Sequence, residues 1–312
     1  MSLLATRTEQ SADGTTKVLW QLFDRLTVES VILPRALKQR KKLALWETGS
    51  ETLESPRFTA CLSSQVGCAM ACDFCLTGKQ GYTRNLSPAE IIGQVEGLNR
   101  LKPIKNLVFM GMGEPLQNTA NVVTAIQYLL KNGFSRRKIT VSTSGVASEI
   151  IKLAKTRVKL AVSLNATTDA LRSELMPINR KFSIGTLLVA SKEYAAISGQ
   201  TVMLEYILLA GVNDRAEDAE RLFNLASGWD CKVNLIPYNP FDGTPYLRPD
   251  PVSVKEFQHH LVSKGITATV RYSGGDDILA ACGQLKSLDA VAKRGFNRHL
   301  HGTVLDDGPE KE

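Results

Sequence analysis

The alternation of strand-like and helix-like segments is the feature that most limits how this chain can fold. From residue 57 onward, runs rich in apolar and β-branched residues recur at 57–64, 106–113, 138–145, 158–165, 201–209, 232–239 and 268–274. Segments with helical periodicity separate most of these runs, at 87–101, 121–133, 183–199, 213–228 and 253–265. Ser87, with Glu90 in the first turn, is expected to cap the first helix, and Gly199 to end the third. Strand followed by helix, repeated about six times, predicts an α/β fold with a parallel sheet and right-handed crossovers. Because a closed barrel of this kind has eight strands, both a partial barrel and a doubly wound sheet fit the pattern.

The first 56 residues do not continue this alternation. Residues 16–23 and 27–33 each alternate apolar and polar side chains around a short turn, which predicts a β-hairpin. The polar stretch that begins at Pro34 is expected to form an exposed insertion or linker. We therefore expect three parts, namely an N-terminal hairpin with a basic linker over 1–56, a core over 57–286 and a C-terminal tail over 287–312.

The composition narrows the class of protein and its location. The 312 residues allow one large domain or two small ones, and 43% hydrophobic with 22% charged residues is ordinary for a globular chain. Since no apolar run is long enough to span a membrane and the N-terminus lacks the features of a signal peptide, we expect a cytoplasmic protein. The net charge of +7 permits a polyanionic partner. Most of this excess lies in one cluster, which a solvated surface explains equally well: Arg35, Lys38, Arg40, Lys41 and Lys42.

The six cysteines are unevenly placed, and three of them form a CxxxCxxC motif at Cys68, Cys72 and Cys75. Three thiolates on one short loop can converge on a metal centre. A structural zinc site needs four ligands, usually with a second pair 12–20 residues further on, and no such pair follows. A 4Fe–4S cluster normally takes four thiolates, so three cysteines would leave one iron open to a substrate. Three unrelated buried thiols are the remaining alternative.

A CxxxCxxC motif directly after the first strand of a sixfold alternation resembles the radical S-adenosylmethionine (SAM) superfamily. This resemblance implies a partial (βα)6 TIM-like barrel, with the N-terminal β-hairpin as a small extension. Within that superfamily, the sequence is similar to the RlmN/Cfr class of RNA methyltransferases over about residues 10–286. The motifs that carry the resemblance are CLSSQVGCAMACDFCLTGKQGYTRNLSPAEIIGQV, GMGEPLQN, STSG, SLNATTDALRSELMPINRKF, LIPYNP and GDDILAACGQL. The GEPL sequence at 113–116 resembles the RlmN branch, which methylates carbon 2 of adenine. The Cfr branch, which methylates carbon 8, tends to have alanine after the glutamate.

The resemblance implies a role for each matching residue. The cysteine motif would hold a 4Fe–4S cluster whose open iron chelates SAM. Gly113 and Glu114 match the motif that holds the SAM amino group, where an acceptor is needed because an ammonium group only donates hydrogen bonds. The other SAM-contacting positions are matched by Ser142, Ser163, Leu164, Asn165 and Asn239. Asn165 stands where many members have histidine, and asparagine does not titrate near neutral pH. Without the resemblance, Glu114 could equally start a helix and the small polar residues could serve as caps or turns.

The resemblance also implies a reaction that uses two SAM molecules per turnover. The first would methylate Cys282, and the second would be cleaved to a 5′-deoxyadenosyl radical that activates this methyl group for addition to adenine. Cys61 would release the product by attacking the sulfur of Cys282, which forms a disulfide. Glu29 matches the proton acceptor of the family. Taken alone, both cysteines could be buried structural thiols, and Cys231, which matches no motif, is expected to be one.

The implied partners are RNA and a reductant. We expect 23S rRNA as substrate, with tRNA as a second substrate, a flavodoxin or ferredoxin as electron donor, and a monomer that does not bind membranes. Basic residues are candidates for phosphate contacts: the 35–42 cluster and Lys131, Arg136, Arg137 and Lys138. The helical domain that usually precedes this core in the class is expected to be lacking. The alternatives are carbon-8 methylation of rRNA and a non-enzymatic metal-binding RNA module.

Overall fold

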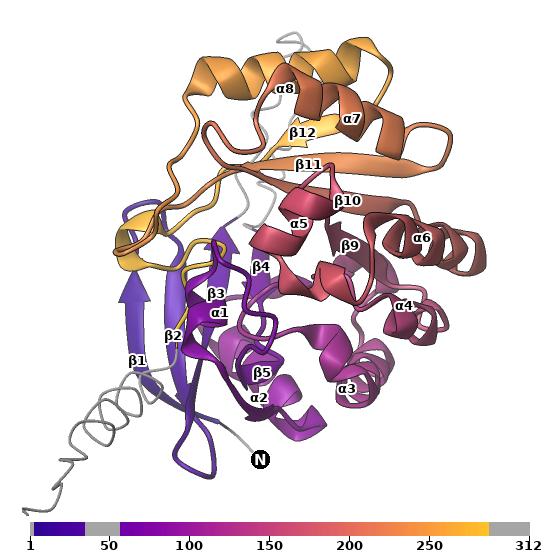
Figure 1. The fold of residues 1–312 in the computed structure, drawn as a ribbon. Helices are drawn as coiled ribbons and strands as arrows, with labels where there is room; N and C mark the ends of the chain where they lie inside the picture. The colour runs from indigo at the N-terminus through magenta and orange to yellow at the C-terminus, as the bar shows by residue number, and fades with distance from the viewer. Residues whose placement is uncertain (1–2, 35–56, 287–312) are drawn as a thin grey trace, which may run out of the picture.

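The computed structural model describes residues 3–34 and 57–286, and a ten-stranded sheet organises them (Figure 1). Seven of its strands are parallel and neighbour one another in chain order: β4 (Phe58–Cys61), β7 (Ile104–Phe109), β8 (Ile139–Thr143), β9 (Lys159–Ser163), β10 (Val202–Leu208), β11 (Cys231–Pro237) and β12 (Ala268–Val270). The sheet curves, and the crossover helices lie around its outside (Figure 1). This confirms the predicted partial (βα)6 barrel, because a doubly wound sheet would carry helices on both faces.

Each pair of successive parallel strands is joined through a helix on the outer side. The main crossover helices are α2 (Pro88–Leu101), α3 (Thr119–Lys131), α4 (Ala147–Ala154), α6 (Ile184–Ser198), α7 (Ala216–Ala226) and α8 (Pro251–Ser263). The sequence predicted all of these except α4, whose eight residues are too short for a clear periodic signal. Two predicted helix ends are confirmed at atomic detail. Ser87 and Glu90 form a reciprocal capping box at the start of α2, and Gly199 ends α6 in the left-handed conformation.

The predicted N-terminal hairpin is present as part of a three-stranded meander. Strands β2 (Thr16–Gln21) and β3 (Thr27–Pro34) form the hairpin, and β1 (Leu4–Gln10) pairs with β2 at the edge. Strand β1 was not predicted because almost all its side chains are exposed, so its sequence carries little apolar alternation. The meander continues the main sheet through the antiparallel pairing of β3 with β4. The predicted basic linker, including Arg35–Lys42, and the predicted C-terminal tail lie outside the described residues.

A second, two-stranded sheet frames the cysteine motif. Strands β5 (Gln65–Gly67) and β6 (Tyr82–Asn85) enclose the loop that carries the three cysteines and the short helix α1 (Leu76–Gln80). A Cβ atom on Gly67 would lie 2.0 Å from the carbonyl oxygen of Gly81, so the two ends of the loop meet only because residue 67 is glycine. The loop is thereby closed at its base and held against the first parallel strand.

The inner face of the curved sheet carries the cavities of the molecule. In β8, Ile139 and Val141 are buried in the core, whereas Thr140 and Ser142 line cavities on the inner side. The same alternation places Ser163 and Glu205 on the inner face of β9 and β10. None of the helices in the described part of the chain is long and apolar enough to cross a membrane.

Candidate active site

One cavity at the carboxyl ends of the parallel strands gathers most of the predicted site residues. Its lining includes Cys68, Cys72, Cys75, Gly113, Glu114, Ser142, Ser163, Asn165 and Cys282. The strand ends bring these residues together from positions more than 200 residues apart in the sequence. Parallel barrels bind their ligands at this end, since every strand there is followed by a loop free to vary. We call this space the cysteine cavity.

The three motif cysteines are buried or half-buried on a compact loop. The Cys75 amide donates to the Cys72 carbonyl at 3.1 Å, and the Cys68 amide donates to the Gly81 carbonyl at 2.7 Å. Burial raises the pKa of all three thiols, that of Cys68 to about 12, so the thiolate form needs a bound cation. Within the described ranges, no three His, Cys, Asp or Glu side chains converge as the ligands of a single metal ion do. Thiolates of a 4Fe–4S cluster bind different iron atoms, so these three residues fit a cluster better than a lone zinc ion.

Glu114 is buried beside the cysteines and is held by a set of donors. Its Oε2 accepts from the Ser144 amide at 2.6 Å and from Ser144 Oγ at 2.7 Å, while Oε1 accepts from the Leu116 amide at 2.9 Å. Burial raises the pKa of this carboxyl, an effect that these three donors reduce. A cationic amino group in the cavity would favour the ionised carboxylate further. The neighbouring position 113 requires glycine, because its φ is 96° and a side chain there would collide with Gln65.

Arg172 ties the ends of two strands together behind Glu114. It is fully buried on α5 (Asp169–Leu175), and its Nη2 donates to the carbonyls of Ser144 at 2.7 Å and Ser163 at 3.0 Å. Its Nε donates to the Leu164 carbonyl at 3.0 Å. Burial lowers the pKa of this guanidinium to about 10, which leaves it charged at neutral pH. Arg172 therefore fixes the backbone that presents Ser144 to Glu114.

Cys61 and Cys282 come from opposite ends of the chain and lie near the same arginine. Cys61 ends β4, and Cys282 lies on the loop after β12, which is held to α1 by a hydrogen bond from the Leu76 amide to the Gly283 carbonyl at 2.8 Å. Burial raises the pKa of Cys61 to about 12, negative charge on Cys282 raises it further, and Arg271 opposes both. Cys282 is in turn the main influence that raises the pKa of Arg271. All six cysteines are free thiols.

Four predicted site residues do not line the cysteine cavity: Cys61, Glu29, Leu164 and Asn239. Glu29 borders a neighbouring hollow, where its Oε2 accepts from the Lys286 amide at 2.9 Å and its Oε1 lies 3.6 Å from Lys17 Nζ. The Leu164 side chain is fully buried, its amide donates to the Glu205 carbonyl at 2.9 Å, and its carbonyl accepts from Arg172. Asn239 sits behind the Cys282 loop and donates to the Cys282 carbonyl at 3.4 Å. Cys231 begins β11 away from the cavity.

Two charged residues on the inner face were not among the predicted site residues. Glu205 lines the cysteine cavity, where Oε2 accepts from Asn234 Nδ2 at 2.7 Å and Oε1 has no hydrogen-bond partner. Arg271 interacts electrostatically with both catalytic candidates described above. Both residues interrupt apolar strand-like runs, and a charged residue at such a position is the signal that could have identified them. The unpaired Glu205 oxygen is consistent with a cavity that accepts a polar ligand.

The class of the protein follows from this fold and from its sequence profile. The profile of the Radical SAM superfamily matches residues 62–226. The protein is therefore a radical SAM enzyme, and the predicted cofactors, a 4Fe–4S cluster and SAM, are confirmed as those of its class. The three motif cysteines and Glu114 line one cavity.

Close relatives narrow this class to one family. The chain is 46% identical to the dual-specificity RNA methyltransferase RlmN of Geotalea uraniireducens (strain Rf4), over 94% of this chain and 81% of the relative. It is 44% identical to the protein of the same name from Campylobacter jejuni subsp. jejuni (strain 81-176), over 90% of this chain and 80% of the relative. The crystal structure of a radical SAM methyltransferase from Sphaerobacter thermophilus matches with a TM-score of 0.80 at 41% identity, over 91% of this chain and 81% of that one. The chain belongs to the RlmN family and is a radical SAM methyltransferase, as predicted.

Proposed function

We propose that the protein methylates carbon 2 of an adenine in 23S rRNA, and of an adenine in tRNA as a second substrate, through a methylated Cys282. The observation that carries the proposal is that Cys282 lines the same cavity as the three motif cysteines and Glu114. The names of the relatives support an RNA substrate. The GEPL sequence at 113–116 supports carbon 2 over carbon 8. The proposal keeps the three-part organisation of 1–56, 57–286 and 287–312, a monomer in the cytoplasm, and a flavodoxin or ferredoxin as reductant.

The residues of the cysteine cavity divide the work of holding the cofactors. Cys68, Cys72 and Cys75 hold the cluster, and Glu114 with Gly113 holds the amino group of SAM. When bound, the cluster and SAM together supply a methyl group and a strongly oxidising carbon radical. The inner-face residues Ser142, Ser163 and Asn165 offer polar groups to the rest of SAM. The proposed SAM contacts of Leu164 and Asn239 rest on the family motifs alone.

Cys282 carries the methyl group from SAM to the base. Its thiolate attacks the methyl carbon of SAM and S-adenosylhomocysteine leaves, which requires a deprotonated sulfur. Loss of one hydrogen atom turns the S-methyl group into a methylene radical on Cys282. Carbon 2 of adenine is electron-poor, so it accepts this radical although it could not attack SAM as a nucleophile.

Cys61 releases the product from the resulting RNA–Cys282 adduct. The radical adduct would first return its unpaired electron to the cluster site, and carbon 2 loses its proton. The Cys61 thiolate then attacks the Cys282 sulfur, the sulfur–carbon bond breaks, and the electron pair stays on the methylene carbon, which takes up a proton to become the methyl group. The reductant then reopens the disulfide. Glu29 is the proposed acceptor of the carbon-2 proton. This role of Glu29 is inferred from the family motif alone, because its carboxylate lies in the neighbouring hollow and not in the cysteine cavity.

The test is an attempt to trap the adduct. Cys61→Ala, incubated without oxygen with SAM, reductant and ribosomal RNA, is expected to accumulate a covalent protein–RNA species attached at Cys282. Cys231→Ala is the matched control and is expected to turn over without an adduct, since Cys231 begins β11 and, unlike Cys61, does not interact with Cys282. An active wild type with no adduct in Cys61→Ala would refute the mechanism. Mass mapping of the product adenine to carbon 8 would refute the choice of carbon 2.

A further inference from the structure

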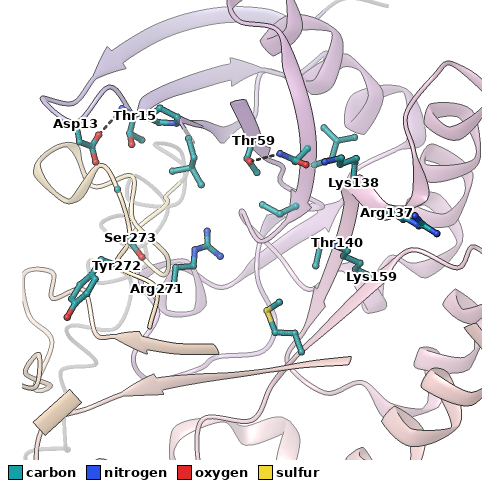
Figure 2. Close-up of a pocket in the computed structure, with 17 residues that line it drawn as sticks. Asp13, Thr15, Thr59, Arg137, Lys138, Thr140, Lys159, Arg271, Tyr272 and Ser273 are labelled. Atoms are coloured by element: carbon teal, nitrogen blue, oxygen red, sulfur yellow. Dashed lines mark hydrogen bonds between the residues drawn. The ribbon is translucent and has the colours of Figure 1, made fainter. Parts of the chain in front are cut away.

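A second large cavity lies on the same inner face of the barrel, nearer the amino ends of the strands (Figure 2). We call it the basal cavity. Its volume of about 870 Å³ is that of a typical ligand pocket. The strand residues in its lining include Thr59 of β4, Asn106 of β7, Thr140 of β8, Lys159 of β9 and Met203 of β10. It is therefore the lower half of the barrel interior, with the cysteine cavity as the upper half.

The lining explains why this half of the interior is not filled. A closed eight-stranded barrel packs its interior with bulky branched side chains, whereas the basal cavity is lined by short or polar ones such as Thr59, Asn106 and Thr140. The opposite wall is built from the turn after β1 and the loop after β12 (Figure 2). There, Asp13 Oδ2 accepts from the Gly275 amide at 2.9 Å and Oδ1 accepts from the Thr15 amide at 2.8 Å. Asp13 is the one carboxylate among the described lining residues, and both of its oxygens are engaged.

The charge at the mouth of the cavity is strongly positive. Arg137 and Lys138 precede β8, Lys159 begins β9, and Arg271 lies deeper inside. Lys138 also borders an adjoining hollow of about 810 Å³, which adds Lys105. As far as the structure describes the chain, Lys105, Arg137 and Lys138 have no ion-pair partner. Unpaired cations around a hollow favour a polyanion such as a nucleic-acid backbone.

The basal cavity leads toward the reacting cysteines. Arg271 lines it, and its Nη1 donates to Sδ of Met110, a lining residue of the cysteine cavity, at 3.7 Å. Its charge also acts on both Cys61 and Cys282. On the other side of Cys282, its loop is fastened to α1, where Thr77 Oγ1 donates to the Leu285 carbonyl at 2.6 Å. A ligand can thus approach Cys282 from the inner face of the sheet, past Arg271. On the opposite side, the hydrogen bond between the Cys282 loop and α1 closes the approach.

We propose that the RNA enters the barrel from the amino-terminal side, so that the target adenosine passes through the basal cavity to Cys282. The phosphates of the nucleotides next to it bind Arg137 and Lys138. This inference rests on the proposed RNA methylation and adds the route and the contacts. It requires an unpaired or flipped adenosine, because a stacked duplex does not fit inside a barrel.

The first test neutralises the mouth of the cavity. Arg137→Gln/Lys138→Gln is compared with Lys155→Gln/Lys255→Gln, which removes the same charge from exposed sites outside both cavities. Binding is measured at several salt concentrations with an RNA fragment that the wild type methylates. Loss of two phosphate contacts should reduce the slope of log affinity against log salt by about 1.4, and the control should keep the wild-type slope. Iron content and the thermal midpoint identify a variant that has simply misfolded.

The second test maps the route directly. An RNA fragment with 4-thiouridine beside the target adenosine is irradiated on the wild-type holoenzyme, and the crosslinked peptides are identified. Crosslinks within 137–140 and at 159 are expected. Crosslinks confined to other surfaces, or an unchanged salt slope in Arg137→Gln/Lys138→Gln, would overturn the route. A wild type that methylates no RNA would instead defeat the proposed function itself, so the two failures are distinguishable.

Discussion

Individual carboxyls and thiols around the cysteine cavity are charged or neutral according to what surrounds them. Glu114 and Glu205 are both buried, and burial raises the pKa of both. Glu114 receives three hydrogen bonds, whereas Glu205 receives one and keeps an unpaired oxygen. The hydrogen bonds therefore stabilise the ionised form of Glu114, which is the form that binds an ammonium group. Ionisation costs more free energy at Glu205 than at Glu114.

Cys61 is expected to resist alkylation in the native protein. With a pKa of about 12, roughly one thiol in 10,000 is ionised at pH 8, against about one in ten for an ordinary cysteine. Iodoacetamide labelling followed by mass spectrometry should show slow modification that rises about tenfold per pH unit up to pH 10. The same protein in denaturant is the control. Native labelling as fast as denatured labelling would contradict the assigned environment.

Glu205→Gln is expected to stabilise the protein in a pH-dependent way. Because burial raises the folded-state pKa above the unfolded value, the folded protein binds the extra proton, and stability falls as pH rises through the folded pKa. Urea midpoints of variant and wild type should thus be close near pH 4.5 and separate toward pH 8, with the variant higher. Glu220→Gln is the control of opposite sign, since Lys264 and His260 lower the pKa of that exposed carboxyl. A constant difference for Glu205→Gln across this range would argue against a buried ionised carboxylate.

At the scale of elements, close contacts fix how helices seat on the sheet. Helix α2 lies over the N-terminal meander, where Gly97 meets Trp20 of β2. A Cβ atom on Gly97 would lie 2.4 Å from Trp20 Cη2, and Trp20 is 2% exposed. The glycine thus permits a helix–sheet approach that its low helix propensity alone would not favour.

Gly97→Ala is expected to destabilise the protein although alanine is the better helix former. Overpacking against Trp20 costs about 1–3 kcal/mol. The better helix propensity of alanine gains only about 1 kcal/mol, so the net effect is a loss of up to about 2 kcal/mol. Gly185→Ala on α6 is the matched control, because the nearest neighbour of its added Cβ is 3.8 Å away. Chemical unfolding measures both. A Gly97→Ala variant as stable as Gly185→Ala would show that Trp20 moves aside without cost.

At the scale of the whole molecule, the two ends of the described chain hold each other. Ser11 Oγ donates to Asp277 Oδ1 at 2.5 Å, Lys17 Nζ donates to the Ile278 carbonyl at 2.6 Å, and Asp13 receives the Gly275 amide. These contacts join the meander to the loop that carries Cys282. The position of the reacting cysteine therefore depends on strands that contribute no predicted cofactor ligand.

Asp13→Ala is expected to loosen the Cys282 loop and to lower the free energy of unfolding by about 1 kcal/mol. Limited proteolysis should cut within 273–286 several-fold faster than in the wild type, because the Gly275 amide loses its acceptor. Asp242→Ala changes an exposed carboxylate outside this contact and is the control. Equal cleavage rates in the two variants would show that the loop is held independently of the meander.

The sequence was most informative wherever the signal lies within a few residues. The capping box of α2, the glycine stop of α6 and the CxxxCxxC loop are all local, and each is formed as predicted. The motifs also indicated which residues gather at the strand ends, and most of them do. Strand β1 gave no signal because its exposed side chains follow no apolar period.

Tertiary structure decided which distant residues meet. Glu205, Arg271 and Arg172 stand alone in apolar or amphipathic stretches, and their partners come from other strands and loops. The separation of Glu29 from the cysteine cavity and the existence of the basal cavity likewise depend on the curvature of the sheet. The sequence alone determined the repeating βα pattern, the cysteine motif and the class of enzyme, since these are set by short-range spacing. Only the fold decided which side chains share the barrel interior, because that depends on strand register and packing between segments up to about 260 residues apart.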